Sequence, residues 1–251
     1  MEDKKVVVVT GGSSGMGLAI SKKLKKLGMH VIIFDIQSPP EDFEFYHVDI
    51  RDDRQIKSAL INIPKLDILV NNAGVYFEKY LEDTTNEEID RMVDINIKGT
   101  YMMTRNAFSK IKDAKGSIVI IASCLGLVPE LTSPLYCTTK AGLVMLTKCL
   151  AQQYGEYGIR VNCVLPGPIN TPLLQKSFPD EETAICCAER VPLKRIGEPE
   201  DIANMVAFLI SENAGYITGG AFPVDGGVSS SSMCIQNNFD FWESQTFPYW
   251  A

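Results

Sequence analysis

The sequence predicts an α/β protein built on a single doubly wound parallel sheet with helices on both faces. Short β-branched runs alternate with longer stretches in which apolar residues recur at helical spacing. Strands separated by helices of this length form right-handed crossovers, and therefore a parallel sheet of about seven strands. The chain has 251 residues, of which 45% are hydrophobic and 22% charged. A sheet of this kind can form one domain of ~250 residues.

The first elements are predicted from an apolar run and the glycines that follow it. Residues 6–9 are all valine, as expected for a strand that is buried on both faces. A glycine-rich segment and apolar residues at helical spacing come next, and Gly28 ends this helix after Leu27. Two more strands are expected at residues 30–34 and 43–48.

The remaining elements continue the same alternation. The other strands are expected at residues 67–70, 117–122, 159–164 and 221–224. The other helices are expected at about residues 52–61, 86–110, 133–154 and 198–211. Pro64 closes off the first of these helices, and Pro199 lies in the first turn of the last. We expect the segment before this last helix to be rich in loops.

The composition argues against several classes of function. With 24 basic and 31 acidic residues the net charge is −7, so the chain lacks the basic surface that binds nucleic acid or an anionic membrane. Residues 1–5 run directly into the valine strand without the apolar segment of a secretory signal, and no apolar run approaches the ~18 residues of a membrane span. Seven cysteines indicate reduced thiols in a cytoplasmic protein. The two histidines, with no Cys-x-x-Cys, predict neither a bound metal nor a Ser-His-Asp triad.

A glycine-rich loop lies between the first strand and the first helix, at residues 10–17. Glycines there let the backbone turn sharply and approach a pyrophosphate, which the free N–H groups at the helix start can bind. Such a loop alone is also compatible with an ordinary tight turn. In its strand–helix context it predicts a Rossmann-type nucleotide site, with the candidate ligands Gly11, Ser13, Ser14, Gly15, Met16 and Gly17.

Asp35 ends the second strand, 20 residues after Gly15. A carboxylate in this place accepts hydrogen bonds from both hydroxyls of an adenosine ribose and repels a 2′-phosphate. The positions where a phosphorylated cofactor would require a basic residue hold Ser13, Ser14 and Ile36. We therefore predict NAD rather than NADP, with Asp35 and Ile36 among the residues that bind it.

Tyr136 and Lys140 are four residues apart and share one face of a predicted helix. A tyrosine hydroxyl titrates near ~10 and is a poor base at neutral pH. An ammonium group one turn away, together with an oxidised nicotinamide, favours the phenolate and lowers its pKa. Tyr136 can then exchange a proton with an alcohol or carbonyl oxygen, and Ser123 can hold the same oxygen. Since Tyr-x3-Lys is common on amphipathic helices, the assignment also depends on Ser123, Asn96 and the glycine loop.

Residues 5–227 resemble the short-chain dehydrogenases/reductases. The glycine loop resembles that family's Thr-Gly-x3-Gly-x-Gly segment, and residues 136–140 match its Tyr-x3-Lys. Further matches are Asp49, the Asn-Asn-Ala-Gly run at 71–74, Asn96, Ser123 and the Pro-Gly-Pro-Ile-Asn-Thr run at 166–171. Because no part of the family pattern is missing and the spacings agree with one another, the resemblance is specific.

The resemblance implies which residues form the site. It implies an active site of Asn96, Ser123, Tyr136 and Lys140, in which Asn96 anchors a water that links Lys140 to solvent. It implies further cofactor contacts from Asp49, Ile50, Asn72, Ala73, Gly74, Tyr136, Lys140, Pro166, Gly167, Ile169 and Thr171. Asp49 would lie beside the adenine, and Ile169 and Thr171 would contact the carboxamide of the nicotinamide. Thr171 also fits a helix cap before Pro172.

We expect an NAD-binding catalytic domain over residues 1–227, with a substrate lid at about 172–192, and an aromatic-rich tail at 228–251. The tail holds both tryptophans of the chain. Because a tail rich in aromatic residues is unlike a disordered one, we expect it to dock over the substrate cleft or on a neighbouring subunit. Docking on its own surface without a role is the alternative. The resemblance implies a homodimer or homotetramer formed through the long helices.

The expected function is hydride transfer between NAD and a small-molecule secondary alcohol or ketone, with Tyr136 as general acid/base. Sugars, polyols or small cyclic alcohols are the favoured substrates. A hydroxysteroid or 3-oxoacyl reductase of the same family is the alternative. An epimerase or dehydratase would usually have a longer chain, and a non-catalytic NAD-binding regulator would usually lack one of the serine, tyrosine and lysine.

Overall fold

The computed structural model describes residues 4–176 and 180–230. They form one seven-stranded sheet in the order β3-β2-β1-β4-β5-β6-β7, and every neighbouring pair of strands is parallel. The strands are β1 (Val6–Thr10), β2 (His30–Asp35), β3 (Glu44–His47), β4 (Ile68–Asn71), β5 (Ser117–Ile121), β6 (Arg160–Pro166) and β7 (Ala221–Val224). This arrangement confirms the predicted Rossmann-type sheet.

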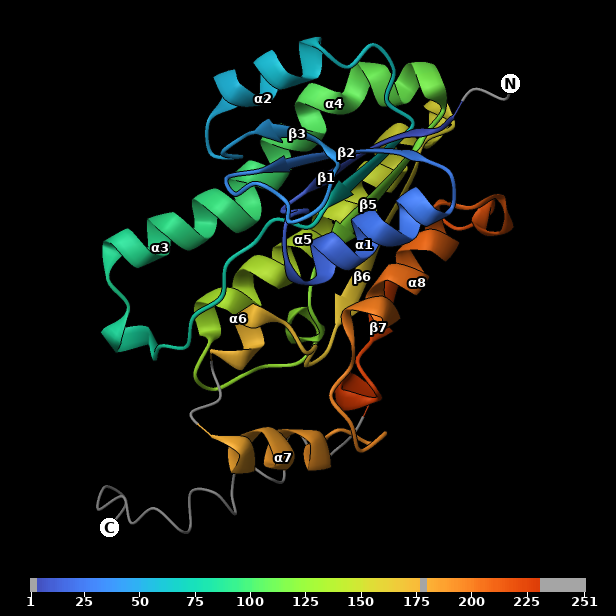
Figure 1. Ribbon diagram of the computed structural model, residues 1–251. Coiled ribbons are helices and arrows are strands. Elements are labelled where there is room, and N and C mark those ends of the chain that lie inside the picture. The colour runs from blue at the N-terminus through green and yellow to red at the C-terminus, as the bar shows by residue number, and fades with distance from the viewer. Residues whose placement is uncertain (1–3, 177–179, 231–251) are drawn as a thin grey trace, which may run out of the picture.

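Helices cover both faces of the sheet (Figure 1). They are α1 (Gly15–Lys26), α2 (Asp53–Ile61), α3 (Asn86–Val93), α4 (Thr100–Ala114), α5 (Pro134–Tyr154), α6 (Pro172–Gln175), α7 (Glu181–Arg190) and α8 (Pro199–Ile210). α1 and α8 pack together on one face, and α2, α4 and α5 cover the other. None of the helices in the described ranges is long and apolar enough to cross a membrane.

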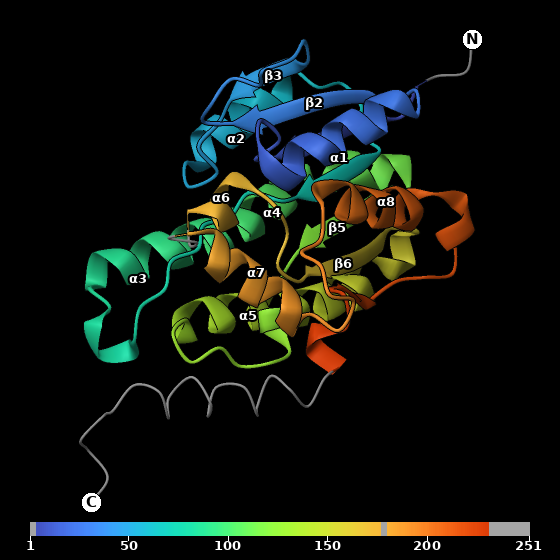
Figure 2. The same cartoon turned by 60° about the horizontal axis from the view of Figure 1, so that its bottom comes forward.

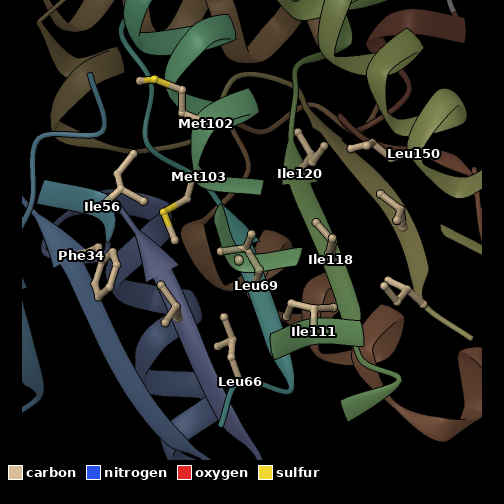
Figure 3. Close-up of a cluster of buried hydrophobic side chains, with 14 of the residues drawn as sticks. Phe34, Ile56, Leu66, Leu69, Met102, Met103, Ile111, Ile118, Ile120 and Leu150 are labelled. Carbon is tan, nitrogen blue, oxygen red and sulfur yellow. The ribbon is translucent and has the colours of Figure 1, made fainter. Parts of the chain in front are cut away.

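The sheet separates two buried apolar clusters, because successive side chains of a strand point to opposite faces. Val8 of β1 belongs to the cluster under α2, α4 and α5, which Figure 3 shows around Met103 and Ile118. Val7 and Val9 belong to the cluster under α1 and α8. Burial on both faces is why this strand is a continuous valine run rather than an alternating pattern.

The predicted helix at 86–110 is in fact two helices joined by a π-helical turn. α3 ends at Val93, the π turn spans Asp94–Gly99, and α4 begins at Thr100. The prediction of one regular helix was wrong because Asp94–Gly99 form a π turn within a helical stretch that is otherwise continuous. Such turns often occur at functional sites.

Two helices, α6 and α7, lie in the segment that the sequence predicts to be rich in loops. α6 and α7 lie on the same side of the molecule as α3 and the start of α5 (Figure 2). No residue of α7 is buried, so core periodicity could not reveal it. The available signal was Asp180, whose carboxylate caps the helix by accepting the Thr183 N–H at 2.8 Å.

Parts of two predicted segments fall outside the described residues. These are residues 177–179 of the predicted lid and residues 231–251 of the predicted tail, with all of the tail's aromatic residues. The tail prediction therefore stays a prediction. The described chain ends in a short 3-10 turn at Val228–Ser230.

Candidate active site

The glycine loop has a backbone that only glycine supports. Gly11 and Gly15 have φ values of +63° and +50°, in the left-handed region. A Cβ atom on Gly17 would collide with the carbonyl oxygen of Gly11. The side chain of Ser14, the residue before α1, makes no capping hydrogen bond, so it does not compete for the first N–H groups of the helix. This cradle fits a pyrophosphate bound at a helix N-terminus.

Hydrogen bonds hold residues 71–74 against this loop. The backbone N–H groups of Asn72 and Ala73 both donate to the Thr10 hydroxyl, at 3.0 and 3.1 Å. The Asn72 amide donates to the carbonyl oxygens of Thr10 and Gly11, at 3.0 and 2.9 Å. A Cβ atom on Gly74 would lie 3.3 Å from Asn96 Oδ1 and 3.6 Å from Lys140 Nζ. Gly74 therefore lies where the cofactor loop meets the candidate catalytic side chains.

Asp35 fixes the other side of the loop. Its two carboxylate oxygens accept the N–H groups of Ser13 and Gln37, at 3.0 and 3.1 Å. The Ser13 hydroxyl donates to the Gln37 carbonyl oxygen at 2.6 Å, and the neighbouring Ile36 is exposed. Asp35 thus lies at the end of β2 beside the glycine loop, and the contacts of Asp35 and Ile36 with an adenosine stay a prediction.

Asp49, predicted to lie beside the adenine, is bound to Arg51. Arg51 Nη2 lies 2.6 Å from Asp49 Oδ2, and this hydrogen bond lowers the pKa of the Asp49 carboxyl. Sequence reasoning did not consider Arg51 among the cofactor-side residues. The neighbouring Ile50 is buried and packs against Gly99, where a Cβ atom would lie 2.6 Å from its Cδ1 atom.

Ser123, Tyr136 and Lys140 come together where the end of β5 meets α5. Lys140 is buried, and its Nζ atom donates to the Ile121 carbonyl oxygen at 3.0 Å. The same atom lies 5.4 Å from the centre of the Tyr136 ring. The Ser123 side chain lies beside the Tyr136 hydroxyl and acts to lower its pKa. The structure thus brings the three side chains together, and their catalytic roles stay a prediction.

The protonation of this cluster is set mainly by burial. Burial lowers the pKa of Lys140 to about 8. Burial raises the pKa of Tyr136 above its ordinary value, while the Ser123 side chain acts in the opposite direction. The sequence predicts a lowered pKa for Tyr136 when an oxidised nicotinamide is bound. The chain alone does not produce that lowering, and the effect of a bound nicotinamide on Tyr136 stays a prediction.

Asn96 lies in the π turn and is fully buried. Its Oδ1 atom accepts the Val75 N–H at 2.8 Å, and its Nδ2 atom donates to the Val75 carbonyl oxygen at 3.0 Å. Nδ2 also donates to the Thr139 hydroxyl at 3.2 Å. The side chain therefore anchors the loop after β4 to α5. The implied role of Asn96 in holding a water stays a prediction.

The Pro-Gly segment follows β6 directly. The Gly167 N–H donates to the Val224 carbonyl oxygen at 3.1 Å, and Ile169 forms a bridge with Gly197. The Thr171 hydroxyl caps α6 by accepting the Leu174 N–H at 3.3 Å. Its Cγ2 atom lies 3.4 Å from the place of a Cβ on Gly15. Thr171 is therefore a helix cap and also lies against the glycine loop.

Sequence reasoning missed the side chains that surround Tyr136. The ring of Tyr76 packs edge-to-face on Tyr136, with centroids 4.8 Å apart. The Tyr76 hydroxyl donates to Glu78 Oε1 at 2.7 Å and accepts from the Ser133 hydroxyl at 3.4 Å. Glu130 is half-buried nearby, and burial raises its pKa, as does the charge of Glu78. One signal in the sequence could have pointed to Tyr76 and Glu78. Both come shortly after the Asn-Asn-Ala-Gly run, which follows the end of a predicted strand at the edge of the site.

The candidate residues gather at the carboxyl ends of β1, β2, β4, β5 and β6, where open parallel sheets bind ligands. Residues 11–229 match the family model described as enoyl-(acyl carrier protein) reductase. The chain is a short-chain dehydrogenase/reductase. Enzymes of this family transfer a hydride between a nicotinamide cofactor and hydroxyl or ketone substrates.

Relatives of this short-chain dehydrogenase/reductase include the 3-oxoacyl-[acyl-carrier-protein] reductase of Rickettsia bellii, 37% identical over 88% of this chain and 95% of the relative. The fold of this chain is similar to that of ligand-free aldohexose dehydrogenase from Thermoplasma acidophilum, with a TM-score of 0.88 and 32% identity over 91% of this chain and 95% of that one. It is also similar to ElxO with NADP bound, with a TM-score of 0.85 and 31% identity over 91% of this chain and 100% of that one.

Proposed function

We propose that this enzyme interconverts a secondary alcohol and its ketone, with Tyr136 as the group that exchanges the proton of the substrate oxygen. The observation that carries the proposal is the grouping of the three side chains. The Ser123 side chain lies beside the Tyr136 hydroxyl and acts to lower its pKa, and the centre of the Tyr136 ring lies 5.4 Å from the buried Lys140 ammonium. Lys140 also lies next to Gly74, in the run whose backbone is hydrogen-bonded to the glycine loop.

Each side chain has a separate task in this proposal. Ser123 donates a hydrogen bond to the substrate oxygen and holds it beside the Tyr136 hydroxyl. Tyr136 takes the hydroxyl proton during oxidation and returns it during reduction. The charge of Lys140 favours the phenolate form of Tyr136. The hydride is accepted or supplied by the bound nicotinamide.

We propose NAD rather than NADP as the preferred cofactor. The Asp35 carboxylate is held against the glycine loop by the Ser13 N–H at 3.0 Å, so its charge lies where a 2′-phosphate would come. The bound NADP of the similar protein ElxO makes NADP the rival to test. Arg51 is paired with Asp49 at 2.6 Å, which leaves it less available to a phosphate.

We propose that the substrate is uncharged and hydroxylated, such as a sugar, polyol or small cyclic alcohol. The side chains near Tyr136 include Tyr76 and the carboxyl groups of Glu78 and Glu130. Carboxylates accept hydrogen bonds from hydroxyl groups and repel anions. The similarity to an aldohexose dehydrogenase agrees with this choice. The similarity to a 3-oxoacyl reductase supports the alternative of an acyl thioester substrate.

We further propose a cytoplasmic enzyme that assembles as a homodimer or homotetramer through α4 and α5. Tyr101 on α4 and Met145 on α5 are 54% and 57% exposed, although both are large and apolar. Each of these exposed side chains would lose contact with water in such an assembly. Sedimentation at micromolar concentration tests the association.

A panel of alcohols tests the function. The purified chain is mixed with NAD or NADP and a sugar, a polyol, a cyclic alcohol, a hydroxysteroid or a 3-hydroxyacyl thioester, and NADH or NADPH absorbance is followed. The proposal expects oxidation of an uncharged alcohol with NAD. Cofactor binding without turnover of any alcohol or ketone would contradict it and favour a regulator.

A further inference from the structure

Tyr76 is the side chain that supports the ring of Tyr136 from outside its own helix. The two rings meet edge-to-face, with centroids 4.8 Å apart and planes at 76°. This is a favourable arrangement for an aromatic pair. Tyr76 lies on the loop after β4, whereas Tyr136 lies in the first turn of α5, so the contact joins two separate elements of the site.

The Tyr76 hydroxyl is held on two sides. It donates to Glu78 Oε1 at 2.7 Å and accepts from Ser133 Oγ at 3.4 Å. Burial raises the pKa of Tyr76, so the group keeps the proton that it donates to Glu78. A ring held at both its edge and its hydroxyl has little freedom to rotate.

The Ser133 side chain binds the Tyr76 hydroxyl instead of capping its own helix. Ser133 is the residue before α5, where a serine side chain usually accepts a backbone N–H of the first helical turn. Here it makes no capping bond, and its buried hydroxyl donates to Tyr76 instead. The helix that carries Tyr136 thus begins with a serine that binds the neighbouring loop rather than the helix itself.

The loop that carries Tyr76 is fixed at both ends. Asn96 binds the backbone N–H and carbonyl of Val75, at 2.8 and 3.0 Å. The Lys79 N–H donates to the Thr132 carbonyl oxygen at 2.7 Å. Because its loop is held on both sides, Tyr76 has a fixed position. Its ring can therefore restrict the orientation of the Tyr136 ring.

We propose that Tyr76 is a positioning residue, which holds the Tyr136 ring in its reactive orientation through their ring contact and the bonds of its own hydroxyl to Ser133 and Glu78. This rests on the proposed role of Tyr136. A small misplacement of a reacting group can reduce turnover about 100-fold, so loss of the contact lowers kcat rather than cofactor affinity.

The test compares three variants with a control in the same loop. Tyr76→Leu removes the ring contact, Tyr76→Phe keeps the ring and removes the hydroxyl, and Ser133→Ala removes one hydrogen bond. Tyr80→Leu is the matched control, because Tyr80 lies in the same loop segment and, among the described residues, its ring makes no contact with that of Tyr136. The measurements are kcat and KM, the pH dependence of kcat, and NADH affinity from fluorescence.

The proposal expects kcat to fall about 10- to 100-fold in Tyr76→Leu, with a moved pH profile and NADH affinity within about twofold of wild type. Tyr76→Phe and Ser133→Ala should show smaller effects of the same kind, and Tyr80→Leu should show neither. A wild-type kcat and pH profile in Tyr76→Leu would overturn the proposal. If Tyr76→Leu does not fold, an unchanged pH profile in both milder variants would overturn it.

A second readout does not depend on activity. In protein labelled with 3-fluorotyrosine, the ¹⁹F resonance of Tyr136 is identified by its loss in Tyr136→Phe. It should shift or broaden in Tyr76→Leu and Ser133→Ala but not in Tyr80→Leu. An unchanged resonance would count against the positioning role, whereas absent turnover in wild type with a normal resonance would count only against the proposed function.

Discussion

The Lys140 ammonium lies 5.4 Å from the centre of the Tyr136 ring, one helical turn further along α5. Its Nζ atom also donates to the Ile121 carbonyl oxygen at 3.0 Å, so the charge is fixed between β5 and the tyrosine. Burial lowers the pKa of Lys140 to about 8. The charge is therefore present at neutral pH, but its burial reduces the stability of the folded protein. The arrangement of Tyr136 and Lys140 therefore leads to predictions for catalysis and for stability.

Replacement of Tyr136 by phenylalanine should reduce turnover by about 10²- to 10⁴-fold, because it removes only the oxygen that transfers the proton. NADH should still bind with nearly wild-type affinity, as measured by fluorescence titration. Turnover is measured by NADH absorbance. Substantial activity in this variant would rule out the proposed acid/base role.

The stability of the protein should rise with pH through the titration of Lys140. The folded pKa of about 8 is below the ordinary value of 10.5, so between these values the unfolded chain holds a proton that the folded chain has lost. Stability therefore increases with pH in this window. Relative to Lys140→Met, wild type should gain about 2 kcal/mol in free energy of unfolding between pH 7 and pH 9.5.

Urea denaturation of both proteins at the two pH values measures this difference, and the other titrating groups cancel in the comparison. A difference that does not change with pH would show that Lys140 keeps an ordinary pKa in the folded protein.

Replacement of Asp35 by asparagine should weaken the discrimination against NADP. The amide keeps an oxygen that can accept the Ser13 N–H, now at 3.0 Å, but carries no charge to repel a 2′-phosphate. The ratio of kcat/KM for NAD to that for NADP should fall about tenfold or more, which corresponds to ~1.4 kcal/mol. A wild-type enzyme that is faster with NADP than with NAD would contradict the assignment at once.

Removal of the charge of Glu130 should admit anionic substrates. We expect Glu130→Gln to raise kcat/KM about tenfold for a cyclic alcohol that bears a carboxylate, since charge repulsion is lost. The matching carboxamide should be unaffected. Glu212→Gln, an exposed change after the end of α8, is the control. Equal effects on the carboxylate and the carboxamide would show that charge does not select the substrate.

The aromatic tail should contribute to the active enzyme. Truncation after Ser230 removes the tail's aromatic residues but keeps the Ser229 N–H, which Asp225 accepts at 2.9 Å. A raised KM with intact assembly would indicate a tail over the cleft, and lost assembly would indicate a tail that joins subunits. Unchanged kinetics and sedimentation would contradict both roles.

The sheet and the motif residues could be predicted because their signals are local. The valine run marks a strand buried on both faces, and Tyr136 and Lys140 share a helix face at a spacing of four residues. The π turn that carries Asn96 was not predicted, because residues 86–110 were expected to form one regular helix, whereas Asp94–Gly99 form a π turn. α7 was missed because none of its residues is fully buried, so no run of core residues marks it.

The amino-acid sequence by itself determined the parallel sheet, the glycine cradle and the identities of the candidate catalytic side chains, since each depends on residues close together in the chain. Tertiary structure alone decided what surrounds them. Ser133 and Tyr76 are 57 residues apart, and Asn96 reaches Thr139 across 43 residues. No local pattern encodes such contacts, because they form only when crossover connections bring the loop after β4 against the start of α5.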